Sequence, residues 1–209
     1  MYKGRLFVIS GPSGVGKGTI CKMVLDKVDA VLSVSMTTRK QRQGEVDGES
    51  YHFVSVEEFE LTMQAGGFLE YAKVYGNYYG TPKKRVTEKL GEGRDVILEI
   101  DVQGAAQIKK QHPEGIFIFC LPPSIAELRD RILKRGTETE ENIKLRMIET
   151  LSEILQIVNY DYCIINSDVT QAVAGMKAII ESHHYKITND IYELTEKYKE
   201  EMNALSINK

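Results

Sequence analysis

The chain has 209 residues, 42% of them hydrophobic and 27% charged, an ordinary globular composition that excludes a disordered chain. This length fits one domain with a small insert or appendage. A net charge of −3 argues against a general nucleic-acid binder, which is usually strongly basic. The three cysteines lie far apart without a CxxC pair, so they predict neither a disulfide framework nor a zinc site, but small buried hydrophobic side chains.

Apolar segments are short throughout the sequence. The N-terminal sequence MYKGRLFVISGPSG has too short an apolar run for a signal peptide, and no stretch approaches the length of a membrane span. These observations predict a cytoplasmic protein without a membrane partner.

Compact apolar runs alternate with longer helical patterns along most of the chain. The runs at 5–10, 95–100, 116–121 and 162–166 are nearly continuous in apolar residues, as expected for parallel strands covered on both faces. Helical patterns lie at about 17–28, 102–111, 124–134 and 139–158. Strands that alternate with helices predict an α/β fold with a central parallel sheet. Thr137 and Glu140 fit a capping box that would start the last of these helices.

Two segments depart from this alternation. Residues 32–80 are rich in Tyr, Ser, Thr and Gly and contain short alternating runs, which predict a small mixed or antiparallel sheet inserted after the first helix. The tail from Lys186 predicts one amphipathic helix, whose stripe should pack on the body or on a partner chain. The apolar residues of that stripe are Ile191, Leu194, Tyr198, Met202 and Leu205.

A glycine-rich loop follows the first predicted strand and opens the first helix. Its residues are Gly11, Pro12, Ser13, Gly14, Val15, Gly16, Lys17, Gly18 and Thr19. Backbone N–H groups in such a loop turn toward a phosphate chain, and the helix N-terminus adds partial positive charge. Lys17 is placed to reach the β- and γ-phosphate oxygens. The strand before and the helix after favour phosphate binding over a plain glycine-rich turn.

The loop departs from the general pattern at the residue after the lysine. A Ser or Thr that approaches Mg²⁺ usually stands there, whereas this chain has Gly18 and places the hydroxyl one residue later, at Thr19. We therefore assign no direct side-chain metal ligand and expect Thr19 and Asp101 to act through water. Glu99 lies two residues before Asp101 and should point the same way, so the sequence leaves open which carboxylate matters more.

Arginines and tyrosines gather in the insert. Arg39 and Arg42, three residues apart, suit an anionic phosphate because the planar guanidinium fork binds oxygens in pairs. Tyrosine hydroxyls add donors without adding charge. Each of these residues alone is also typical of an ordinary surface, but the whole set in order is specific.

Together these segments resemble the guanylate kinase family. The matching motifs are GPSGVGKGT, SVSMTTR, GEVDGESYHFV, FLEYAKVYGNYYGTP, ILEIDVQG and KRGTETEE, and the resemblance covers about residues 5–183. It implies a P-loop NTPase fold with a central parallel sheet, a small mixed-β GMP-binding insert and a helical lid. It also implies transfer of the γ-phosphoryl group of ATP to GMP, with Mg²⁺ accompanying ATP, in purine nucleotide metabolism.

The resemblance also implies boundaries and roles. The kinase domain would span 1–185, with its core at 1–31 and 82–185, the GMP-binding region at about 32–81 and the lid at about 133–150; a helical extension would follow at 186–209. The GMP phosphate is assigned to Ser35, Arg39, Arg42, Tyr51 and Tyr79, and the guanine to Glu70, Thr81 and Asp101. ATP is assigned to the glycine-rich loop with Arg135 and Asn166. Charge neutralisation during transfer is assigned to Lys17, Arg39, Arg135 and Arg146.

The chemistry of guanine agrees with this assignment. One carboxylate at Glu70 can accept from N1–H and the 2-amino group together, whereas adenine offers neither donor. An unpaired buried carboxylate can reject such an analogue by ~10⁴-fold.

Two alternatives remain open at this point. A P-loop kinase could act on another small acceptor, and guanylate-kinase-like domains also serve as non-catalytic interaction modules, although these typically lose the phosphate-loop residues that this chain keeps. Under the leading hypothesis the partners are ATP and GMP, and neither nucleic acid nor a membrane is a partner. The protein would be a monomer or a homodimer. Use of dGMP is left open.

Overall fold

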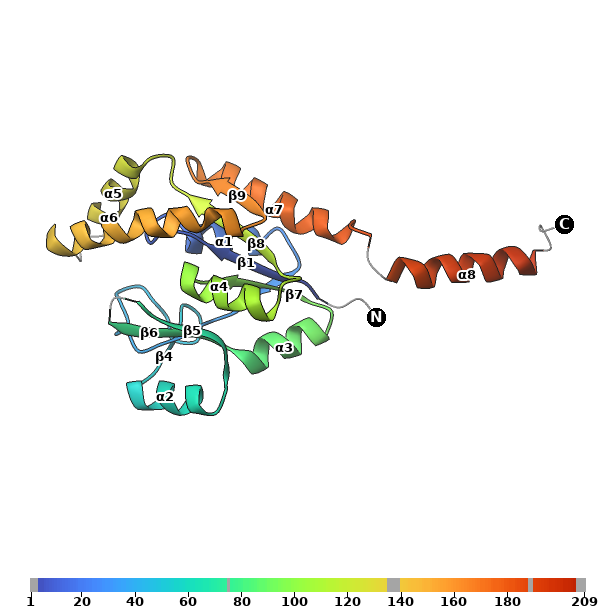
Figure 1. Ribbon diagram of the computed structural model, residues 1–209, viewed down its shortest axis with the longest axis horizontal. Helices are drawn as coiled ribbons and strands as arrows, with labels where there is room; N and C mark the ends of the chain where they lie inside the picture. Colours follow the sequence, from blue (N-terminus) through green and yellow to red (C-terminus); the bar gives the residue numbers. More distant parts are fainter. Residues whose placement is uncertain (1–3, 75, 135–139, 188–189, 206–209) are drawn as a thin grey trace.

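The computed structural model of the chain describes residues 4–74, 76–134, 140–187 and 190–205. Within these residues the larger sheet has five parallel strands in the order β2-β7-β1-β8-β9 (Figure 1). Its strands are β1 (Leu6–Ser10), β2 (Ala30–Leu32), β7 (Asp95–Glu99), β8 (Ile116–Leu121) and β9 (Tyr162–Ile165). The predicted α/β fold with a central parallel sheet is thereby confirmed. Strand β2 lies after the predicted end of the first helix and ends at the first residue of the predicted insert.

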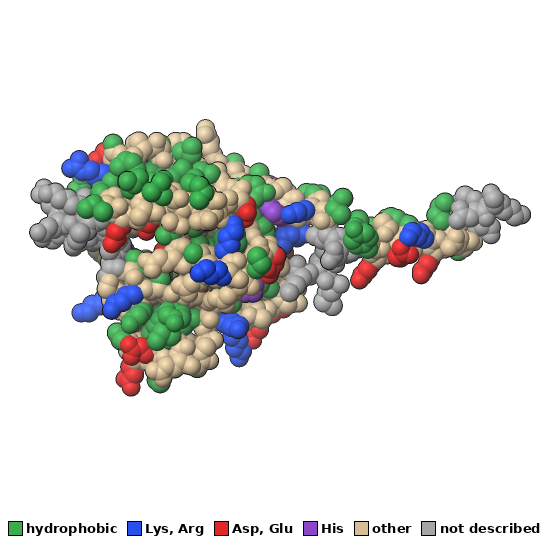
Figure 2. Space-filling view, in the orientation of Figure 1, with side chains coloured by type: hydrophobic (Ala, Val, Ile, Leu, Met, Phe, Trp, Pro, Cys, Tyr) green, Lys and Arg blue, Asp and Glu red, His purple; other side chains and the backbone are tan. Residues whose placement is uncertain are grey.

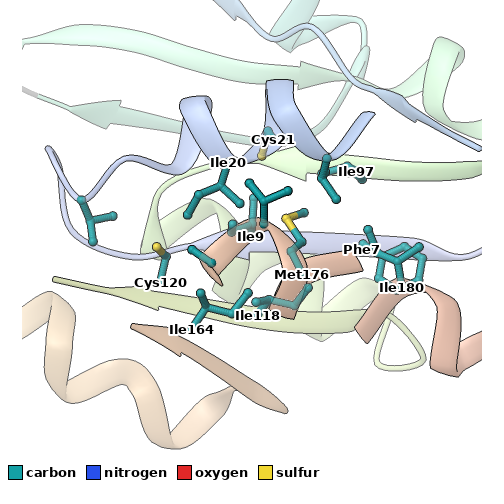
Figure 3. Packing of buried hydrophobic residues seen from close by; sticks show 14 of the residues in the cluster. Phe7, Ile9, Ile20, Cys21, Ile97, Ile118, Cys120, Ile164, Met176 and Ile180 are labelled. Carbon is teal, nitrogen blue, oxygen red and sulfur yellow. The ribbon is translucent and has the colours of Figure 1, made fainter. Parts of the chain in front are cut away.

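Helices cover both faces of this sheet. They are α1 (Lys17–Leu25), α3 (Lys83–Gly91), α4 (Val102–Gln111), α5 (Ile125–Lys134), α6 (Glu140–Ile154) and α7 (Val169–His184). On one face, Ile9 and Ile118 pack with Ile20 of α1 and Met176 of α7 (Figure 3). On the other face, Val8 of the same central strand packs in a second cluster with residues of α3 and α4. Because both faces are covered, β1, β7 and β8 read as continuous apolar runs.

The last strand, β9, is not covered on both faces as its apolar sequence predicts. Tyr162 and Ile165 of β9 are 37% and 57% exposed, because β9 is an edge strand that pairs only with β8. The prediction that all three cysteines are buried is accordingly wrong for Cys163, which is exposed, whereas Cys21 and Cys120 are buried.

A smaller mixed sheet forms the insert, with strand order β4-β3-β6-β5. Its strands are β3 (Met36–Thr37), β4 (His52–Phe53), β5 (Phe68–Val74) and β6 (Asn77–Pro82). Strands β3 and β4 are parallel, while β6 runs antiparallel to both β3 and β5. Helix α2 (Val56–Gln64) packs on this sheet through Phe59, whose ring stacks 4.5 Å from that of Phe68. The mixed sheet agrees with the sequence, but α2, α3 and α7 lie where the sequence patterns place no helix.

Two glutamines of α4 connect the sheets. Gln107 donates through Nε2 to the carbonyl of Tyr71 at 2.8 Å, and Gln111 donates to the carbonyl of Leu69 at 3.0 Å. Both acceptors lie on β5, so the edge of the smaller sheet rests on a helix of the larger one.

The C-terminal helix α8 (Asp190–Ala204) extends away from the body (Figure 1). Its apolar stripe is exposed, with Tyr198 54% exposed, and Figure 2 shows hydrophobic side chains among charged ones along it. Among the described residues α8 packs on no element of the body. Of the two predicted partners of its stripe, the body is therefore not the one seen here, and a partner chain stays a prediction.

Elsewhere the differences from expectation are small. Helix α1 ends at Leu25 rather than near residue 28, and residues 155–159 form a 3₁₀ turn, η1 (Leu155–Asn159), instead of a last α-helical turn. The capping box at Thr137 lies outside the described residues. No helix among those described is both long and apolar enough to cross a bilayer.

Candidate functional site

The glycine-rich loop connects the C-terminal end of β1 to the N-terminus of α1. Gly16 precedes the helix with φ at 98°, a left-handed conformation that glycine adopts without steric cost. Lys17 folds back over the loop, and its Nζ donates to the carbonyls of Gly11 at 2.5 Å and Pro12 at 3.0 Å. The ammonium group is thus held at the mouth of the loop, where a phosphate chain would arrive.

A buried brace supports the loop from behind. Asn166, 6% exposed, donates through Nδ2 to the carbonyl of Val15 at 2.8 Å. Arg131 donates to the carbonyl of Asn166 at 2.9 Å and to that of Val15 at 3.4 Å. Arg131 belongs to none of the motifs recognised in the sequence. The local feature that could have indicated a role is Glu127, four residues earlier, with which it forms an ion pair.

Helix α6 brings a carboxylate to the same loop. Burial raises the pKa of the Glu153 carboxyl group, while the positive charge of Lys17 opposes that shift, which places this carboxyl group near the loop. No sequence motif includes Glu153, because it lies far from the loop in the sequence.

The insert contains a cationic and aromatic cluster. Arg39 pairs with Glu45 at 2.7 Å between Nη2 and Oε1, and its guanidinium carbon lies 5.4 Å from the ring centroid of Tyr51. The rings of Tyr51 and Tyr79 lie 5.9 Å apart. Burial, followed by the charge of Glu99, raises the pKa of Tyr51 to about 12, so its hydroxyl remains a donor at neutral pH.

Two other residues assigned to the same anion lie around this cluster. Ser35 is buried, and the backbone N–H of Arg42 donates to Oε2 of Glu45 at 2.8 Å, while the Arg42 side chain is exposed. Glu45 therefore holds Arg39 and the Arg42 backbone together. Partial burial works against its ionisation, but the Arg39 hydrogen bond lowers the pKa of Glu45 below its usual value. The sequence motif contains Glu45 but gives no sign of this role.

A second buried carboxylate lies where the insert meets the larger sheet. Glu70 is 3% exposed and accepts a hydrogen bond from the Thr81 hydroxyl at 2.6 Å. Burial raises the pKa of Glu70 to about 7, the Thr81 hydrogen bond opposes this, and the charge of Asp101 adds to it. Asp101 itself caps α4, accepting from the backbone N–H groups of Gln103 at 2.7 Å and Gly104 at 3.1 Å.

The structure brings most of the sequence-assigned residues to the C-terminal ends of β1 and β7 and to the facing insert. Ligands of open α/β sheets bind at this edge. Thr19 is exposed on α1. Arg135 lies outside the described residues; Arg146 belongs to α6, and its side chain is not among those described.

Known proteins resemble the chain over most of its length. A family model described as guanylate kinase matches residues 3–183. The guanylate kinase of Clostridium tetani is 54% identical over 187 residues, covering 90% of each chain. That of Clostridioides difficile is 53% identical over 201 residues, covering 96% of this chain and 98% of the relative. A crystal structure of guanylate kinase from Anaplasma phagocytophilum superposes with a TM-score of 0.76 at 33% identity, covering 88% of both chains.

Proposed function

The chain belongs to the guanylate kinase family, and we propose that it transfers the γ-phosphoryl group of ATP to GMP, giving ADP and GDP. The observation that carries this proposal is the placement of two sites side by side. The phosphate loop follows β1, and the buried Glu70–Thr81 pair lies beside Asp101, which follows the adjacent strand β7. A donor phosphate and an acceptor nucleotide would therefore meet at one edge of the sheet.

The donor site is proposed to work by neutralising charge. Phosphoryl transfer requires little covalent help from the protein, because positioning and electrostatic stabilisation supply most of the catalysis. Lys17 is already held at the loop by two backbone carbonyls, so its ammonium group is positioned before a phosphate binds. We propose that the segment at about 133–150 is the lid and that Arg135 and Arg146 add charge from it.

The acceptor phosphate is proposed to bind at the Arg39 cluster, formed by Ser35, Arg39, Arg42, Tyr51 and Tyr79. In the structure Glu45 holds Arg39, so a phosphate would compete with that carboxylate or share the guanidinium with it. The rings of Tyr51 and Tyr79 lie 5.9 Å apart, and we propose that both hydroxyls donate to this phosphate. The cluster belongs to the proposed GMP-binding region at about 32–81.

Guanine recognition is proposed for Glu70, Thr81 and Asp101. The Glu70 carboxylate is buried and positioned by Thr81, and in its ionised form it would accept from N1–H and the 2-amino group of guanine. An adenine ring would leave it without these donors, which costs the full desolvation penalty of a buried charge.

The oxygen donors near the loop fit Mg²⁺. This ion prefers oxygen ligands, keeps several waters and is usually bound through one or two carboxylates together with substrate phosphates. Within the described part of the chain there is no group of three or more His, Cys, Asp or Glu residues suited to a metal. We propose Glu99, and Thr19 and Asp101 through water, as the groups that would hold it. When bound, Mg²⁺ would neutralise charge on the phosphates of ATP.

The proposal is tested by ADP production from ATP and Mg²⁺ with GMP, AMP, CMP, UMP or no acceptor. Turnover with GMP far above the other acceptors is the expected result. Turnover with a different acceptor would overturn the guanine assignment, and ATP binding without turnover would favour a non-catalytic interaction module. We place the reaction in purine nucleotide metabolism in the cytoplasm.

A further inference from the structure

Two buried hydroxyl groups lie near the start of the phosphate loop. Ser10 is the last residue of β1 and directly precedes the loop, and Tyr160 lies between η1 and β9. Within the described part of the chain, Ser10 Oγ and Tyr160 Oη are the two buried side-chain oxygens without a hydrogen-bond partner. A buried polar atom without a partner is costly, so each such atom calls for an explanation.

The larger sheet brings these two residues together. Ser10 is the register partner of Phe119 on the neighbouring parallel strand β8. Both side chains point to the face that α4 covers, as do those of Val8 and Phe117 two residues earlier. The ring of Tyr160 packs edge-on against that of Phe119, with centroids 4.8 Å apart, and against that of Phe117 at 6.3 Å. Tyr160 therefore covers the end of β1 that carries Ser10.

The Tyr160 hydroxyl keeps its proton at neutral pH. Burial raises its pKa to about 12, the nearby Ser10 hydroxyl opposes this shift, and the charges of Asp101 and Glu153 add to it. The two hydroxyls are thus neighbours that do not have the geometry of a completed hydrogen bond. A small movement would let Tyr160 donate to Ser10 Oγ.

Tyr160 also lies at a junction that is suited to such a movement. It follows η1, which continues α6, and it precedes β9, which pairs with β8 in the sheet. The proposed lid at about 133–150 includes the first part of α6. A cavity of about 290 Å³, lined also by Val102 and Phe117, borders Tyr160. The tyrosine ring therefore has room to shift, which a close-packed core would not offer.

We propose that Tyr160 is a positioning residue for the phosphate loop, and that its hydroxyl donates to Ser10 Oγ when a nucleotide binds and the lid closes. The bond would fasten the end of α6 to the strand from which the loop starts. Gly11 follows Ser10, and its carbonyl accepts from Lys17 Nζ, so the bond would also steady the segment that holds this lysine. The inference rests on the proposed use of ATP and on the proposed lid.

The first test removes one hydroxyl at a time and measures the binding of ADP with Mg²⁺ by calorimetry, using the full chain without an acceptor. Tyr160→Phe keeps the ring that packs on Phe119, and Ser10→Ala removes the other hydroxyl. Each variant should bind ADP about 3- to 10-fold more weakly, the value of one net hydrogen bond that forms only in the bound state. The double variant should bind no more weakly than either single one.

A second tyrosine in the same segment provides the matched control. The hydroxyl of Tyr162 lies 3.1 Å from Nε2 of His183 on α7, so Tyr162→Phe should leave ADP affinity unaltered. Equal losses of affinity in Tyr160→Phe and Tyr162→Phe would overturn the proposal. Additive losses in the double variant of Ser10 and Tyr160 would overturn it as well.

Melting temperatures separate positioning from simple packing. Without nucleotide the Tyr160 hydroxyl has no partner to lose, so Tyr160→Phe should melt at the wild-type temperature or slightly above it. With saturating ADP and Mg²⁺, its melting temperature should rise less than that of the wild type. The same decrease with and without ADP would show that the bond already exists in the free protein, against the proposal. This readout remains if Ser10→Ala fails to fold.

These experiments separate the role of Tyr160 from the overall function, because they measure ADP binding and do not require the acceptor to be GMP. If Tyr160→Phe weakened ADP binding but the wild type did not phosphorylate GMP, the proposed function would fail while the role of Tyr160 stood. If the wild type phosphorylated GMP and Tyr160→Phe bound ADP equally well, only the role of Tyr160 would fail.

Discussion

The hydroxyl of Thr81 donates a 2.6 Å hydrogen bond to Oε1 of Glu70, across neighbouring antiparallel strands of the insert. The two residues are register partners, next to an irregularity in β5 between Phe68 and Glu70. This bond positions a carboxylate that has almost no contact with solvent. Its second oxygen, Oε2, lies beside Gly104 at the start of α4, so the carboxylate is held between the smaller sheet and helix α4.

Binding of GMP should depend on pH through Glu70. Burial raises the pKa of this carboxyl group to about 7, and guanine donors require the ionised form. The KM for GMP should therefore be nearly flat above pH 7 and rise up to ~10-fold per pH unit below it. Steady-state kinetics from pH 5.5 to 8.5 measure this.

The GMP phosphate itself titrates at pH ~6, so Glu70→Gln is the necessary control. This variant should lose the part of the pH dependence of the KM for GMP that comes from Glu70. Its preference for GMP over AMP should also be smaller than that of the wild type. A wild-type profile identical to that of Glu70→Gln would show that guanine is read elsewhere.

Glu70 should also affect stability. Its pKa rises from 4.5 to about 7 on folding, so between these values the folded protein holds a proton that the unfolded chain has released. The resulting contribution to stability is fully present below pH 4.5 and is lost as the pH rises through about 7. Glu70→Gln does not titrate, so its melting temperature relative to wild type should increase from pH 5 to pH 8. A constant difference across this range would contradict the buried, titrating carboxyl group.

Gly104 should be needed for the position of Glu70. A β-carbon at position 104 would collide with Oε2 of Glu70, so Gly104→Ala should displace the carboxylate and raise the KM for GMP by at least ~10-fold. ATP affinity should change little, because the phosphate loop is not involved. Gly175→Ala on α7 is the matched control: its β-carbon would meet nothing within 4 Å, and the helix should gain up to ~1 kcal/mol. Equal effects of both substitutions on GMP would rule out a specific contact.

Lys17 should be essential for turnover and dispensable for folding. Lys17→Ala removes the ammonium group held at the loop, and kcat should fall by at least ~10²-fold through lost stabilisation of transition-state charge. Its melting curve should resemble that of the wild type. Lys22→Ala on the exposed side of the same helix should leave kcat unaltered. Near-normal turnover in folded Lys17→Ala would remove the central role given to the loop.

Features with local spacing could be predicted from the sequence. The phosphate loop joins a strand to a helix within nine residues, and α4 has its predicted bounds because Asp101 caps it and an apolar run precedes it. Strand β2, only three residues long, is too short to show a period. Whether a strand lies at an edge depends on its neighbours in the sheet, so the run at 162–166 gave no warning that Cys163 is exposed.

The residues of the candidate site likewise fall into those that the sequence predicts and those that only the fold reveals. Residues inside motifs, such as Lys17, Arg39 and Glu70, were found by their types and order. Other residues near them were not found in this way, because they lie far away in the sequence or have no role that their motif indicates. They are Glu153 at the loop, Arg131 behind it, and Glu99, whose carboxylate lies beside Gly18. Such contacts produce no recognisable pattern of spacing in the sequence, because only the fold brings these segments together.

The exposure of Cys163 provides a ready attachment point for a fluorophore. Cys21 and Cys120 are buried, so a maleimide dye would mark β9 without any cysteine being added or removed. Because partial burial still raises the pKa of the Cys163 thiol, mildly alkaline buffer would favour the coupling. Three residues further along, Asn166 is bonded to the carbonyl of Val15. Dye emission would then report, optically and in real time, when a nucleotide enters and leaves the loop.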